Sequence, residues 1–112
     1  MRIPARYFPH QVTTEAVDPM GGGRRWKPAK TGVRALVAPS DALIIDQRPD
    51  AESVGQQIVA NTQVIVQPES YVGPGARVTI WPGTARERVL SAARVDTYDH
   101  DIAPNSVVLW LV

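Results

Sequence analysis

The chain has 112 residues, a formal net charge of +1 and no cysteine. The length fits a single domain, and the lack of cysteine excludes disulfides, cysteine-ligated zinc and thiol chemistry. The nearly neutral charge gives no general indication of nucleic-acid or membrane binding, residues 1–6 lack the apolar core of a signal peptide, and no apolar run approaches the roughly 20 residues of a membrane span.

The first half of the chain contains two expected strands. Ten prolines and eight glycines divide the sequence into short segments rich in Val, Ile and Thr, a pattern typical of a small barrel or sandwich. Residues 11–17 are expected to form the first strand, which ends before the glycines at 21–23. Residues 32–38 alternate as a second strand, and Pro39 is expected to end it.

Residues 39–57 are the least regular segment. A short apolar group, Leu43, Ile44 and Ile45, lies between polar stretches that contain proline. A connection of this length is uncommon in a compact domain unless it is functional or partly disordered. We therefore expect a long loop after the second strand.

The next segments continue the β pattern. Residues 58–67 alternate as a long strand with one wetter face, closed by Pro68, and residues 77–81 form a shorter strand between two Pro-Gly pairs. Residues 84–95 allow two interpretations. A capping box at residues 84–87 favours a helix, whereas a strand would pair back across Pro82-Gly83, with Val89, Ser91, Ala93 and Val95 on one face.

The last segment, residues 107–112, is apolar on both faces. One face of such a strand belongs to the core, and the other needs a cover. A neighbouring subunit supplies that cover in one interpretation, and the monomer itself supplies it in the other. The first interpretation makes Val108, Trp110 and Val112 candidate interface residues.

No catalytic motif accompanies these segments. The sequence has no nucleophile elbow and no recognisable pairing of a nucleophile with a base, so we expect a protein that is not an enzyme and that uses no cofactor or metal. Asp99-His100-Asp101 has residue types that ligate cations or exchange protons. Such a cluster beside a turn is usually a solvated loop, and two histidines are few for a zinc site.

A basic and aromatic segment follows the three glycines, and it contains Arg24, Arg25, Trp26 and Lys27. Cations beside an aromatic ring could bind single-stranded nucleic acid through its phosphates and bases. Arg and Trp are also favoured at protein interfaces, and a solvated tip is the third interpretation. The interface interpretation adds Arg24, Arg25, Trp26 and Trp81 to the candidate residues.

The order of the segments resembles the head-to-tail stopper proteins of long-tailed bacteriophages over nearly the full chain. The resemblance rests on residues 3–13, Pro74-Gly75-Ala76-Arg77-Val78-Thr79-Ile80, Arg86-Glu87-Arg88, Tyr98-Asp99-His100 and Val108-Leu109-Trp110-Leu111. It implies an all-β fold, a single small β-barrel of about six to seven strands with a long loop after the second strand. It also favours the strand interpretation of residues 84–95.

The resemblance implies a structural role in the virion neck, with assembly in the host cytoplasm. A homo-oligomeric ring of roughly six or twelve copies would sit between the adaptor ring on the portal and the tail terminator or tail tube, with double-stranded DNA passing through it. Residues 39–57 would help close the channel, which makes Leu43, Ile44, Ile45, Gln47 and Arg48 the channel-loop candidates. An adaptor or terminator ring of the same neck and a barrel that binds single-stranded nucleic acid are the alternatives.

Overall fold

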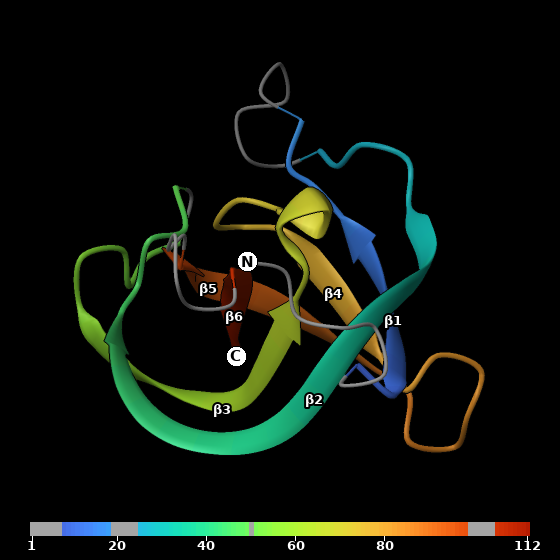
Figure 1. The fold of residues 1–112 in the computed structure, drawn as a ribbon. Helices are drawn as coiled ribbons and strands as arrows, with labels where there is room; N and C mark the ends of the chain where they lie inside the picture. The colour runs from blue at the N-terminus through green and yellow to red at the C-terminus, as the bar shows by residue number, and fades with distance from the viewer. Residues whose placement is uncertain (1–7, 19–24, 50, 99–104) are drawn as a thin grey trace.

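The protein folds into a closed antiparallel sheet of six strands in the order β1-β2-β3-β6-β5-β4 (Figure 1). The structure is a computed structural model that describes residues 8–18, 25–49, 51–98 and 105–112. The strands are β1 (His10–Glu15), β2 (Lys30–Ile45), β3 (Gln57–Val66), β4 (Arg77–Ile80), β5 (Arg88–Tyr98) and β6 (Ser106–Leu111), with a short 3-10 turn η3 (Pro68–Ser70). The predicted all-β barrel is confirmed.

The core lies inside the barrel and is built from alternate residues of each strand. Val64 and Val66 of β3 and Val78 of β4 are fully buried, while Val59 of β3 is exposed on the outer face. The period of two predicted for both strands is therefore confirmed. Each side chain of this size stabilises the fold by roughly 1.5–3 kcal/mol through its removal from water.

The second strand runs through Pro39 instead of ending there. Two features make the proline acceptable: the register of β2 against β3 shifts between Pro39 and Ala42, and β1 pairs with β2 only as far as Ala35. A proline at a bulge on an unpaired edge loses no ladder hydrogen bond. The predicted irregular segment over residues 39–57 is therefore correct only in part: residues 39–45 belong to β2, Gln57 begins β3, and the connection between the two strands is limited to residues 46–56.

Beyond the bulge, β2 and β3 form a two-stranded extension that we call the arm, comprising residues 39–61. Figure 1 shows the two strands sweeping around the barrel until the tip reaches β5. A small second core forms there from Ile44 and Ala60 of the arm and Ala93 of β5, with Trp110 and Val112 packed against it. The arm therefore covers part of the outer surface of β5 and β6.

The terminal strand β6 lies between β3 and β5 and is paired along both edges. Val107, Leu109 and Leu111 face the barrel core, and Val108 on the other face is only 6% exposed. The arm contributes to the cover of that other face through its contacts with Trp110 and Val112. The interpretation in which the monomer supplies the cover therefore agrees with the structure, and Val108 is not a surface residue.

The helix interpretation of residues 84–95 was wrong, because β5 pairs with β4 across the turn at residues 81–87. The capping-box residues do make cap-like contacts inside that turn. The Thr84 hydroxyl accepts a hydrogen bond from the Arg86 amide, and the Glu87 carboxylate accepts one from the Gly83 amide. The sequence signal therefore marked a turn that is stabilised by its own side chains.

The predicted faces of β5 are only partly correct. Val89 is 60% exposed whereas Ala93 is fully buried, although both were expected on one face. The register against β6 shifts between Ala92 and Arg94, and a bulge of this kind interrupts the alternation of side chains. It turns Ala93 toward Ile44 of the arm.

Candidate functional site

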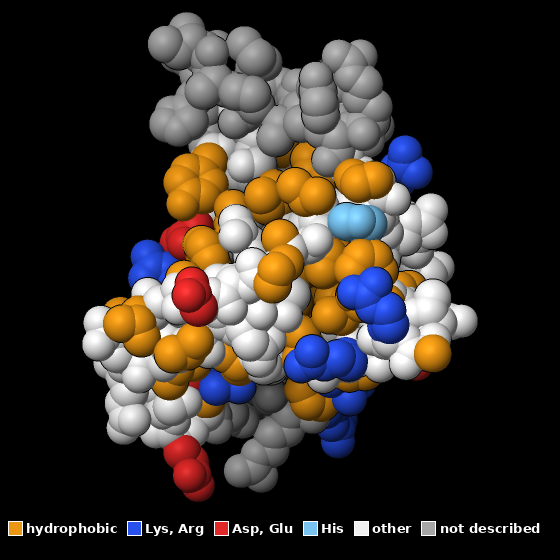
Figure 2. Space-filling model, turned by 90° about the horizontal axis from the view of Figure 1, so that it is seen from below, with side chains coloured by type: hydrophobic (Ala, Val, Ile, Leu, Met, Phe, Trp, Pro, Cys, Tyr) orange, Lys and Arg blue, Asp and Glu red, His pale blue; other side chains and the backbone are white. Residues whose placement is uncertain are grey.

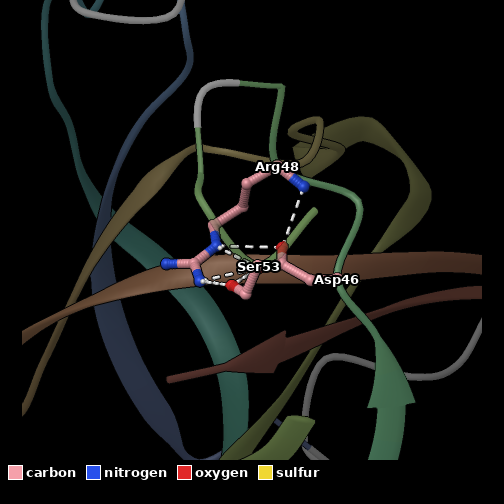
Figure 3. Close-up of polar contacts among 3 residues, drawn as sticks. All are labelled: Asp46, Arg48 and Ser53. Carbon is pink, nitrogen blue, oxygen red and sulfur yellow. Dashed lines mark hydrogen bonds and ion pairs between the residues drawn. The ribbon is translucent and has the colours of Figure 1, made fainter. Parts of the chain in front are cut away.

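The tip of the arm is held by a buried carboxylate (Figure 3). Asp46 lies directly after β2, and its carboxylate accepts hydrogen bonds from the Arg48 amide at 3.0 Å and from the Arg48 guanidinium at 2.8 Å. The Ser53 hydroxyl, from the other side of the connection, donates to the same carboxylate. These contacts tie the two ends of residues 46–53 together.

Electrostatics favour the ionised form of this carboxylate. The pKa of Asp46 falls from 3.8 to about 2, chiefly because of the side-chain hydrogen bond from Arg48 and also because of the one from Ser53, although burial acts in the opposite direction. A buried charge of this kind is tolerated because a paired cation and hydrogen bonds replace its water. Asp46 was not among the sequence candidates, whereas its partner Arg48 was.

The tip is also anchored to the barrel. The Gln47 amide donates a hydrogen bond to the Ala93 carbonyl at 2.7 Å, and the Gln47 side-chain oxygen accepts one from the Val95 amide at 3.3 Å. Two of the five channel-loop candidates, Gln47 and Arg48, therefore hold the position and shape of the tip. Both contacts bind the arm to β5.

The other three candidates lie in β2, where strand alternation separates them. Leu43 is 64% exposed and Ile45 is 42% exposed, whereas Ile44 points inward and is 6% exposed. Val59 of β3 lies directly opposite Leu43 and is 53% exposed. The outer face of the arm therefore carries an exposed apolar surface, which we call the arm patch: Leu43, Ile45 and Val59. Ile44 is a core residue of the arm instead.

The basic and aromatic segment is only partly described, because Arg24 lies outside the described residues. Arg25 is exposed, but Trp26 is committed to contacts within the barrel. The Trp26 indole donates a hydrogen bond to the Gly75 carbonyl at 3.1 Å, and the guanidinium of Arg77 lies 3.9 Å from the centre of its ring. These contacts fasten residues 25–27 to the start of β4.

A second aromatic site lies at the turn between β4 and β5. The Trp81 ring contacts His10 edge to face at 4.8 Å, and the guanidinium of Arg86 lies 4.5 Å above its centre. Trp81 has a positive φ of 52°, which is strained for a bulky residue. The sequence pattern singled out Trp81 but gave no sign that His10, some 70 residues earlier, would meet it.

No cation site is evident in the described part of the chain. No group of three or more His, Cys, Asp or Glu side chains there could hold a metal ion. The Asp99-His100-Asp101 cluster lies outside the described residues. Among the described residues, none of the secondary-structure elements is a helix with the length and hydropathy needed to cross a bilayer.

A comparison of the chain with protein families, curated proteins and solved structures finds no match in any of the three.

Proposed function

We propose that this protein is a structural subunit of the bacteriophage neck, a head-to-tail stopper that joins the DNA-filled head to the tail and helps close the DNA channel. Copies would assemble in the host cytoplasm into a ring between the portal-bound adaptor and the tail terminator or tail tube. The sequence resemblance suggests this role. The small closed barrel is the fold that the resemblance implies, and the arm stands where the resemblance implies a long loop after the second strand.

The observation that carries the proposal is the arm patch. Leu43, Ile45 and Val59 are exposed on a two-stranded element that is fastened at its tip by Asp46 and Gln47. An apolar surface on a rigid element is typical of an assembly contact. Two of the five channel-loop candidates, Leu43 and Ile45, belong to this patch.

A closed ring can be stable even when the contact between two neighbouring subunits is weak. Burial of the exposed parts of the three side chains would contribute about 1 kcal/mol each at one interface. Because the same contact recurs around a closed ring, the assembly gains stability without a large interface between any two subunits.

Genetic removal tests the role in particles. In the phage that encodes this chain, a nonsense mutation in its reading frame should give heads that lose their packaged DNA and tails of normal length that do not join. Electron microscopy of the lysate measures all three properties. Tails of irregular length would instead indicate a terminator, because a terminator ends polymerisation of the tube. Normal infectious particles would contradict every neck role.

A matched pair of substitutions tests the arm patch. Val59→Asp places a charge in the patch, whereas Val89→Asp places it at a similarly exposed valine, 60% against 53%, on β5. Complementation by Val59→Asp should fall at least roughly ten-fold, in line with loss of more than 1.4 kcal/mol at the contact, while Val89→Asp should complement normally. Equal complementation by the two variants would contradict the proposal that the arm patch forms an assembly contact.

A further inference from the structure

A groove opens between the arm base and the turn that connects β4 to β5. Its volume is about 240 Å³, and its polar lining consists of Asn61 and Thr62 of β3 with Arg86 and Arg88. Trp81 forms part of the wall. Figure 2 shows the face of the molecule seen from below, where Lys and Arg side chains gather beside a histidine and a run of hydrophobic side chains. The groove thus combines cations, an aromatic ring and an amide.

The indole of Trp81 is positioned as a platform. His10 contacts it edge to face, and the imidazole is itself fixed because its Nδ1 accepts a hydrogen bond from the Val37 amide at 3.0 Å. The carbonyl of Trp81 accepts a hydrogen bond from the Thr84 hydroxyl at 2.7 Å. A strained backbone that is held this firmly is common at binding sites.

No carboxylate of the described residues neutralises the two cations of the groove, and the Arg86 guanidinium lies 4.5 Å above the Trp81 ring. Arg86 and Arg88 are both exposed, and neither forms an ion pair within the described residues. Three other described arginines each form an ion pair with a carboxylate: Arg48, Arg77 and Arg94. Glu87 lies between the two groove arginines in sequence, but its carboxylate accepts a hydrogen bond from the Gly83 amide inside the turn.

We propose that this groove binds a short stretch of single-stranded nucleic acid. A base stacks on Trp81 or on the Arg86 guanidinium, Arg86 and Arg88 contact phosphates, and Asn61 lies where its amide can reach a base edge. Aromatic stacking combined with cations on the backbone is the usual mode of single-strand binding. An acidic peptide would use the two cations but not the aromatic platform, so the residue types favour nucleic acid. The inference does not depend on the proposed neck function.

The structure also favours the Trp81 groove over the basic and aromatic segment around Trp26 as the nucleic-acid site. Trp26, the only aromatic residue of that segment, donates its indole N–H to Gly75 and lies against Arg77. A guanidinium lies over both indole rings, but Trp81 lines a groove together with Arg86 and Arg88, whereas the indole N–H of Trp26 is bound to the barrel backbone. Arg25 and Lys27 remain exposed and provide a matched control for charge.

Fluorescence anisotropy with a labelled oligothymidylate of about 10 nucleotides tests the site. The full chain should bind with an affinity that falls as salt rises. Arg86→Ala combined with Arg88→Ala should weaken binding roughly ten-fold or more and lower the slope of log affinity against log salt by about 1.4, which corresponds to two phosphate contacts. Arg25→Ala combined with Lys27→Ala should change neither quantity.

A second variant separates the platform from the charges. Trp81→Gly removes the ring and accommodates the positive φ, and circular dichroism verifies that the variant is folded. It should weaken binding by roughly ten-fold or more with the salt slope unchanged. Absence of binding at low salt, loss of binding only in the Arg25 and Lys27 variant, or equal competition by polyglutamate would each overturn the proposal.

Discussion

Asp46 is the residue on which the shape of the arm tip depends. Its carboxylate is the only acid in contact with Arg48 among the described residues, and it joins that side chain to Ser53 across the connection. The sequence pattern indicates Arg48 but not Asp46, because an aspartate after a strand has many possible partners. Only the path of residues 46–53 brings the hydroxyl of Ser53 to the same carboxylate.

The lowered pKa of Asp46 predicts a pH dependence of stability. The carboxyl has a pKa of about 2 when folded and an ordinary value of 3.8. Its contribution is therefore fully present above pH 3.8 and is lost as the pH falls toward 2, a loss of about 2 kcal/mol. Urea unfolding at pH 5 and pH 2 should show a larger fall in free energy for the wild type than for Asp46→Asn. Equal falls in the two proteins would contradict this assignment.

At the scale of the element, the arm is a strand pair with one buried and one exposed face. The sequence pattern located an apolar group at residues 43–45 but predicted a loop there, because Pro39 was expected to end the second strand. Proline usually ends a strand, and nothing in the local sequence reveals that the proline lies at a bulge on an unpaired edge. A single misplaced boundary thus grouped Ile44 with its exposed neighbours.

Neighbouring residues of the arm therefore differ in their contribution to stability. Ile44→Ala should lower the free energy of unfolding by about 2 kcal/mol or more, because it empties the small core beneath the arm. Leu43→Ala should change it by less than about 0.5 kcal/mol, because Leu43 is 64% exposed. Denaturant unfolding measures both values, and similar losses would contradict the strand register assigned here.

At the scale of the whole molecule, the closed barrel depends on pairings between distant segments. The strand of residues 58–67 and the final strand were both recognised from alternation and hydrophobicity, but their pairing was not. Pairing partners so far apart in sequence leave no local signal. The apolar faces of β6 were compatible with a subunit interface or a central strand, and only the placement of the arm distinguishes them.

The central position of β6 changes what truncation can test. Removal of residues 107–112 would remove any subunit contact of the terminal strand, but it also removes the strand that joins β3 to β5. Leu109→Ala is a gentler probe, and it should cost about 3 kcal/mol because the side chain is fully buried. Val112→Ala, at a half-buried valine, is the control. Thermal and urea unfolding should show a clearly smaller loss of unfolding free energy for Val112→Ala than for Leu109→Ala. Equal losses would argue against the central placement of Leu109.

The bulge in β2 has a consequence for solubility. Beyond it, residues 42–45 pair with β3 alone, and β3 pairs with β6 only from Thr62 onward. Such exposed ladders recruit strands from other molecules and promote aggregation in concentrated solution. Pro39, which has no amide hydrogen to offer, and the charged Asp41 both lie at the bulge and are exposed. Proline and charged residues at such positions hinder the pairing of an exposed edge with another molecule.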